Sequence, residues 1–124
     1  MKAGELIETL AAAIIRQEGQ SKTDPNPMNL RDAPWIDFAE RQYVTRGHAG
    51  RFWLPASRQQ GIAGGVHLIA LRIAQGYSLR RLVFAWAPPT DGNDSGAYVA
   101  NVSRWTGIPD IASPLETLID EPAL

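Results

Sequence analysis

The stretch "ELIETLAAAIIRQEG", residues 5–19, decides how the rest of the chain is interpreted. Its apolar residues recur at helical spacing with charged residues between them, which predicts an amphipathic helix. We expect the helix to end at Gly19, because glycine readily takes the left-handed conformation that closes helices. Glu18 follows Ile14 by four residues and Leu10 by eight, so a helix continued to its end places the carboxyl group on the buried side.

The position of Glu18 is typical of a catalytic acid. Apolar surroundings and the partial negative charge of a helix C-terminus both raise the pKa of a carboxylic acid, which keeps it protonated near neutral pH. A loop rich in Pro, Asn and Asp follows at residues 20–34 and can form one wall of a cleft. This is the layout of a general acid at a glycosidic bond. Periodicity alone leaves open the alternative that Glu18 is a solvated residue at a frayed helix end.

Composition excludes several classes of protein. At 124 residues the chain is expected to form one domain, residues 1–124, around a single core. A net charge of -1 argues against a nucleic-acid partner, and the lack of cysteine excludes disulfides and thiolate chemistry. Glu5 and Glu8 interrupt the N-terminal apolar run, so we expect synthesis in the cytoplasm without a signal peptide. No apolar run approaches the roughly 20 residues of a membrane span.

The remaining segments predict a helix-dominated fold with a small hairpin. Two β-prone pieces, residues 41–45 and 51–55, flank a turn with two glycines. Three more helices are expected at residues 57–76, 78–87 and 94–107, followed by a short one from Ser113. In the helix that Ser57 opens, Gln60 is the expected capping-box partner. The buried stripe of that helix is predicted to be Ile62, Val66, Ile69 and Ile73. The fold class is therefore mainly α (α+β), one helical core with a hairpin wing.

No metal site is expected. Asp91, Asn93, Ser95 and Gly96 occupy positions 1, 3, 5 and 6 of an EF-hand loop, but position 12 is Val102 rather than a bidentate acid. A capped turn before a helix explains that segment better. Neither histidine has a second ligand at helical spacing, and no G-x-S-x-G elbow is present for a serine nucleophile. The four tryptophans fit a core, although one or two could stack on sugar rings at a cleft.

Three segments in order carry a resemblance to a known family. They are Glu18-Gly19, "NPMNLR" at residues 26–31, and "FAWAPPTDGNDSGAYVANVSRWTG" at residues 84–107. Together they resemble the phage and prophage lytic transglycosylases of the lysozyme-like superfamily. Members carry an acid-glycine pair at the end of the first long helix, an N-P-G-N-L-R loop, and a Y-A-P-x-x-D-x-N segment followed by a tyrosine on the next helix. The match covers roughly residues 7–109.

The resemblance implies a lysozyme-like helical domain and a role for each matched residue. It makes Glu18 the single catalytic acid and Tyr98 a cleft tyrosine that can hydrogen-bond it. Asn29 would position sugar amide or hydroxyl groups, and Asn93 would hold the loop before the tyrosine helix. Trp86 stands where the family often has tyrosine and is a candidate sugar contact. The structural alternatives are that Asn93 is a turn residue and that Asn29 only braces its own loop.

One departure from the family pattern affects the loop. Met28 replaces the usual glycine, so a backbone that needs positive φ at this position would be strained or different here.

The resemblance implies a muramidase that cleaves the β-1,4 bond between N-acetylmuramic acid and N-acetylglucosamine in peptidoglycan, without a cofactor. Its partner would be the glycan strand, and it would act on the cell wall or as part of a virion. A hydrolase usually needs a second carboxylate, for which Asp24, Asp32 and Asp37 are candidates. The alternative is a virion structural or glycan-binding protein that keeps the fold without turnover. A weaker alternative is a small helical partner-binding domain. The sequence leaves the oligomeric state open.

Overall fold

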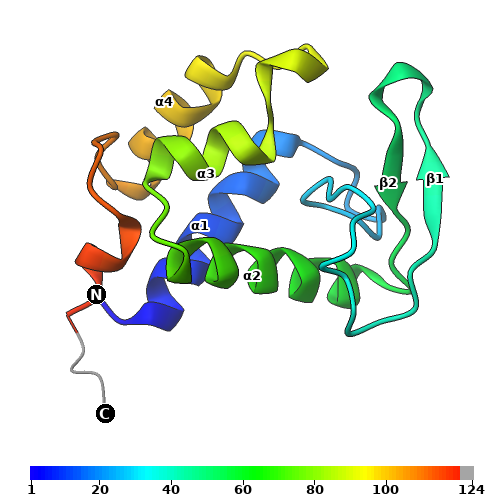
Figure 1. Ribbon diagram of the computed structural model, residues 1–124, viewed down its shortest axis with the longest axis horizontal. Helices are drawn as coiled ribbons and strands as arrows, with labels where there is room; N and C mark the ends of the chain where they lie inside the picture. The colour runs from blue at the N-terminus through cyan, green and yellow to red at the C-terminus, as the bar shows by residue number, and fades with distance from the viewer. Residues whose placement is uncertain (121–124) are drawn as a thin grey trace.

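The computed structural model describes residues 1–120, which form four α-helices and one two-stranded antiparallel sheet (Figure 1). The helices are α1 (Ala3–Glu18), α2 (Arg58–Ala74), α3 (Leu79–Trp86) and α4 (Ser95–Thr106). The strands are β1 (Tyr43–Thr45) and β2 (Arg51–Trp53). Short 3-10 helices lie at Gly47–Ala49, Pro89–Asp91 and Leu115–Leu118. The prediction of a mainly helical fold with a small hairpin is confirmed.

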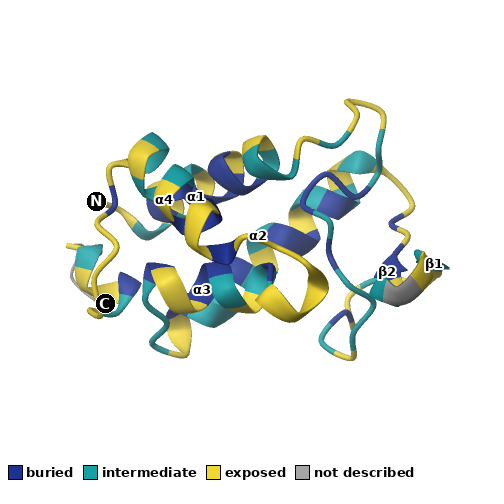
Figure 2. Cartoon of the chain, turned by 90° about the horizontal axis from the view of Figure 1, so that it is seen from above, coloured by how far each residue is buried: buried dark blue, intermediate teal, exposed yellow. Residues whose placement is uncertain are grey.

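Helix α1 lies at the centre of the core. It packs against α2 and α4, and α3 packs against α4. Its buried side carries Leu6, Leu10 and Ile14, each with no exposed surface, as the spacing of these residues predicts. Gly19 closes the helix with φ 62, in the left-handed region that glycine favours. Figure 2 shows that buried residues gather where the four helices face one another. Within residues 1–120, no helix combines the length and apolarity needed to cross a bilayer.

The helix starts follow the predicted capping residues. Ser57 and Ser78 accept hydrogen bonds from backbone N–H groups at the starts of α2 and α3, and Asp94 does the same for α4. At α2, however, the side chain of Gln60 accepts a hydrogen bond from the backbone N–H of Ala56 at 2.7 Å. That residue precedes the cap, so the reciprocal half of the capping box is displaced by one position.

The predicted buried stripe of α2 is partly wrong. Ile69 and Ile73 are buried, but Ile62 and Val66 lie only partly buried. The first half of the helix instead buries a face made of Gly61, Gly64 and Gly65. A Cβ atom on Gly61 would lie 2.0 Å from the carbonyl oxygen of Pro25, so the residue 25–30 loop touches the helix backbone itself. A search for apolar spacing misses such a face, because glycine contributes contact without a side chain.

The hairpin is short and depends on its neighbours. Each strand has three residues, with Tyr43 opposite Trp53 and Val44 opposite Phe52. The backbone N–H of Trp53 donates to the carbonyl of Leu30 at 2.9 Å, which ties β2 to the loop that packs on α2. Figure 1 shows the hairpin at one end of the molecule, beside this loop and away from α4. A two-stranded hairpin of this length needs such support to be stable.

Candidate active site

Glu18 and Tyr98 lie 80 positions apart in the sequence and meet because α1 packs against α4. Glu18 is the last residue of α1 and Tyr98 is buried on α4. The hydroxyl of Tyr98 donates a hydrogen bond of 2.8 Å to Oε2 of Glu18. The structure therefore brings together the acid and the tyrosine that the sequence analysis singled out.

The surroundings of Glu18 raise its pKa above the ordinary value of 4.5. Burial is the largest cause, since it disfavours the charged carboxylate. The hydrogen bond from Tyr98 and, more weakly, the nearby amide of Asn29 oppose it by favouring the charged form. Burial and the charge of Glu18 also raise the pKa of Tyr98, so its hydroxyl stays protonated and remains a donor. Glu18 can thus hold a proton and, after losing it, remain stabilised by a donor.

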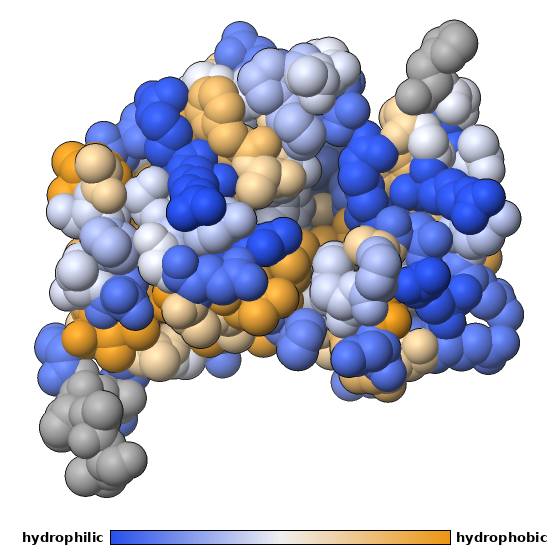
Figure 3. All heavy atoms as spheres, viewed as in Figure 1, coloured by the Kyte–Doolittle hydropathy of each residue, from blue (hydrophilic) through white to orange (hydrophobic). Residues whose placement is uncertain are grey.

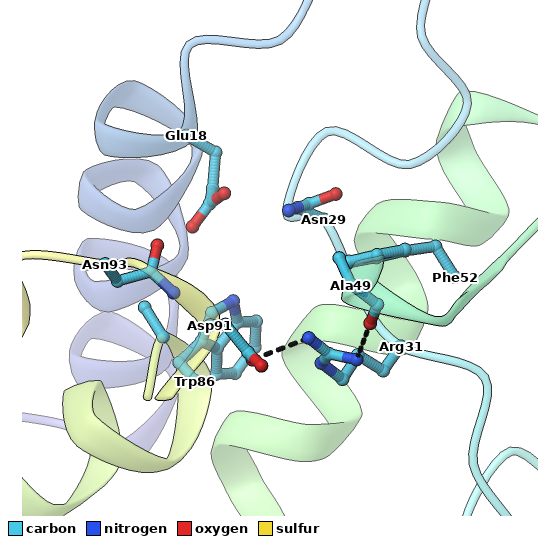
Figure 4. A pocket seen from close by; sticks show the side chains of 9 residues that line it. Glu18, Asn29, Arg31, Ala49, Phe52, Trp86, Asp91 and Asn93 are labelled. Atoms are coloured by element: carbon cyan, nitrogen blue, oxygen red, sulfur yellow. Dashed lines mark hydrogen bonds and ion pairs between the residues drawn. The ribbon is translucent and has the colours of Figure 1, made fainter. Parts of the chain in front are cut away.

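Glu18 faces a cleft of about 150 Å³ between the helices on one side and the loop and hairpin on the other (Figure 4). Figure 3 shows the surface hollowed between these two parts, with hydrophilic side chains on the hairpin side. The residues that line the cleft are Glu18, Trp86, Ala87, Asp91 and Asn93 from the helical side, and Asn29, Arg31, Ala49 and Phe52 from the other side. Four of the five predicted site residues therefore line the cleft, and the fifth, Tyr98, is bonded to Glu18 without lining the cleft itself.

Asn29 occupies a special backbone position. It has φ 54 and is the one non-glycine residue with positive φ in the described part of the chain. Asparagine tolerates this left-handed conformation better than most residues. Met28 does not have positive φ, so the strain considered for this position does not arise, and the positive-φ position of the loop is the next residue. Met28 itself is fully buried against the glycine face of α2.

The side chains of Asn93 and Trp86 each donate a hydrogen bond to a backbone carbonyl and so help to hold the fold. The side-chain amide of Asn93 donates to the carbonyl of Pro88 at 3.1 Å, which holds the loop before α4. The indole N–H of Trp86 donates to the carbonyl of Met28 at 2.9 Å and so joins α3 to the loop across the cleft. Both residues still present surface to the cleft. Their direct roles toward a substrate stay predictions.

Three residues that line the cleft were not predicted from the sequence to belong to it: Arg31, Phe52 and Asp91. Arg31 and Asp91 form an ion pair of 2.5 Å that spans the cleft from the loop to the segment after α3. Arg31 and Asp91 both belong to the quoted motif segments, but no spacing rule indicates that they pair. Phe52 sits beneath the guanidinium of Arg31, with 4.9 Å between the Cζ atom and the ring centroid.

The three candidates for a second carboxylate, Asp24, Asp32 and Asp37, are not among the described residues that line the cleft. Asp24 accepts a hydrogen bond from the backbone N–H of Asn26, and Asp32 pairs with Arg41 at 3.1 Å. Asp37 is exposed elsewhere on the same loop. The other carboxylate that lines the cleft is Asp91, which its ion pair already engages.

Comparison of the chain with models of protein families, with curated proteins and with solved structures finds no match.

Proposed function

We propose that the protein is a peptidoglycan-cleaving muramidase of the lytic transglycosylase type, with a lysozyme-like fold. One observation carries the proposal. Glu18 is a partly buried carboxyl group with a raised pKa, held by the Tyr98 hydroxyl at the wall of an open, mostly polar cleft. This combination is what general acid catalysis at a glycosidic bond requires. The protein would act on the cell wall or as part of a virion.

The reaction would proceed in two proton transfers through one carboxyl group. Protonated Glu18 would give its proton to the glycosidic oxygen as the bond from that oxygen to the anomeric carbon breaks. The resulting carboxylate, stabilised by Tyr98, would take the proton of the muramoyl 6-hydroxyl as that oxygen attacks the anomeric carbon and closes a 1,6-anhydro ring. Because Asp91 is paired with Arg31, a scheme with a single acid suits this cleft better than one with two.

The test is release of soluble muropeptides from purified peptidoglycan by wild type and by Glu18→Gln, with mass spectrometry of the products. We expect anhydro-muramoyl ends from wild type and a loss of roughly 10²- to 10⁴-fold in the variant, the usual contribution of a general acid. Glu8→Gln is the matched control, since Glu8 is an exposed glutamate on the same helix. Reducing ends instead of anhydro ends would make the protein a hydrolase. No release from folded wild type would overturn the enzyme proposal.

A second candidate is a glycan-binding or virion structural protein without turnover, and one observation favours it. The cleft of about 150 Å³ is smaller than the roughly 300–1,000 Å³ of typical ligand sites. The Arg31–Asp91 ion pair, which joins the two sides of the cleft, is part of the lining that gives this volume. Binding of soluble glycan strands without release of products, unchanged in Glu18→Gln, would support this candidate.

A further inference from the structure

Arg46 contacts the site from outside the cleft. It lies in the turn between β1 and β2, where its backbone N–H donates to the carbonyl of Gly50 at 2.9 Å. Its Nη1 atom donates to Oδ1 of Asn29 at 2.6 Å. Its guanidinium lies over the ring of Phe52, with 4.8 Å between the Cζ atom and the ring centroid. Backbone, aromatic ring and hydrogen bond together fix where the side chain of Arg46 points.

This contact decides which way the amide of Asn29 faces. A guanidinium only donates hydrogen bonds, so the group of Asn29 that meets Arg46 has to be the oxygen. The amide nitrogen then lies on the opposite side, and Figure 4 shows it turned toward the carboxyl group of Glu18. If the amide were reversed, an oxygen without a proton would face the carboxylate and would repel it. The orientation of Asn29 therefore matters for the charged form of Glu18.

The backbone of Asn29 does not determine this orientation by itself. The left-handed backbone conformation of Asn29 fixes the direction of its Cα–Cβ bond. Rotation about χ2, however, exchanges the amide oxygen and nitrogen at little cost in energy. Among the hydrogen bonds of residues 1–120, the one from Arg46 is the contact that distinguishes the two ends of this amide. No acidic side chain in the described range forms an ion pair with Arg46, so its donors are free for this task.

We propose that Arg46 is a positioning residue: it holds the Asn29 amide with its nitrogen toward Glu18 and so presents a donor to the carboxylate. The inference concerns the same cleft as the proposed function, and its consequence for turnover rests on that function. The other charged or titratable groups near Glu18 come from separate elements. They are Tyr98 on α4, Asp91 after α3 and Arg31 on the loop.

The test is a pH titration of Glu18 in the substrate-free protein. NMR monitors it through the ¹³C chemical shift of the side-chain carboxyl carbon of Glu18. In Arg46→Met, which keeps an unbranched chain over Phe52, the midpoint moves to higher pH because the carboxylate loses an oriented donor. Arg46→Lys keeps a charged donor and its midpoint stays near that of wild type. Circular dichroism checks that each variant folds, and Arg46→Leu replaces Arg46→Met if the latter does not.

Asn29→Ala, alone and combined with Arg46→Met, distinguishes an effect through the orientation of the amide from a direct effect of the positive charge of Arg46 on Glu18. If Arg46 acts through the amide, Arg46→Met causes no further shift when Asn29 is already alanine. An unchanged midpoint in Arg46→Met alone would overturn the proposal. An equal shift with and without the Asn29 side chain would also overturn it, because Arg46 would then act only as a distant positive charge. The titration needs no substrate, so its outcome is independent of whether the protein cleaves peptidoglycan.

Discussion

Two parts of the molecule are held together by different physics. The helical half, consisting of α1, α3 and α4, is ordered by buried apolar side chains such as Leu10, Ile14 and Val102, each with no exposed surface. The loop-hairpin half, residues 20–57, also buries Met28, Leu30 and Trp53, but a buried polar side chain in addition holds its backbone. Its centre is Asn26, which is 1% exposed, donates to the carbonyls of Leu30 and Trp53, and accepts from the N–H of Leu30.

The difference explains how the candidate site is divided. The helical half supplies the proton-carrying groups, Glu18 and Tyr98, whose positions follow from packing between helices. The loop-hairpin half supplies groups whose direction matters, above all the amide of Asn29 and the guanidinium of Arg31. Hydrogen-bond networks fix direction more sharply than apolar packing does, because they depend on angle as well as distance. We expect the two halves to respond differently to substitution.

The largest effect is expected for Asn26→Ala. It leaves the N–H of Leu30 and the carbonyl of Trp53 without a buried partner and removes one of the two hydrogen bonds to the carbonyl of Leu30, which should cost about 3 kcal/mol of unfolding free energy. Asn101→Ala is the control in the helical half, where the amide donates to Gln17 in a partly buried position, and it should cost less than about 1 kcal/mol. Urea denaturation measures both. Similar losses in the two variants would remove the distinction between the halves.

The same distinction decides what could be predicted from sequence. The end of α1 and both ends of α3 and α4 were predictable because apolar periodicity and the residues that cap or stop these helices indicate them directly. The hairpin was predictable from its glycine-containing turn. The meeting of Glu18 with Tyr98 followed from the family resemblance and not from any spacing rule.

The loop-hairpin half was less predictable, for a physical reason. The side chain of Asn26 forms hydrogen bonds to backbone atoms of Leu30 and Trp53. Every residue has these backbone atoms, so neither hydrophobic periodicity nor the type of the partner residues predicts such contacts. The glycine face of α2 was missed because the prediction placed Ile62 and Val66 on the buried side of the helix. The loop packs against the glycines instead, and the side chains of Ile62 and Val66 are only partly buried. The ion pair of Arg31 with Asp91 joins residues 60 positions apart. It forms only when the loop-hairpin half packs beside the helical half, so the local sequence around either residue does not predict it.

Gly61→Ala is expected to have the next largest effect. The added Cβ would meet the carbonyl oxygen of Pro25 at 2.0 Å, and this backbone atom cannot move without shifting the loop. We expect a loss of about 2–3 kcal/mol, measured by urea denaturation, since overpacking exceeds the gain in helix propensity. Gly4→Ala on α1 has open space around its Cβ and should instead stabilise by up to about 1 kcal/mol. A neutral Gly61→Ala would mean that the loop yields easily.

Glu18→Gln should have a smaller effect, of opposite sign. The pKa of Glu18 is higher in the folded chain than its ordinary value of 4.5, so the native state binds the proton more tightly than the unfolded state. Raising the pH from 4.5 through the folded pKa therefore lowers the stability of wild type. The variant escapes this loss and should be more stable than wild type at pH 7, by less than either of the two preceding substitutions costs.

Thermal unfolding across a pH series measures the difference between Glu18→Gln and wild type. The gain should vanish below pH 4.5, where both states of wild type are protonated. Glu8→Gln provides the control for loss of an exposed glutamate on the same helix. A gain that persists at low pH would show that charge burial is not its cause.

The smallest effect on stability is expected for Asp91→Asn, which weakens the ion pair between the halves. Arg31 and Asp91 remain partly exposed, so we expect a loss below about 1 kcal/mol that shrinks as salt is added. Asp110→Asn is the matched control, because Asp110 pairs with Arg80 at 2.6 Å on the helical side. The two variants should lose similar stability, but Asp91→Asn alone should speed amide hydrogen exchange at Trp53, whose N–H bonds to the loop. Equal exchange in both variants would mean that the halves hold together without this pair, and that Trp86 and the glycine face suffice.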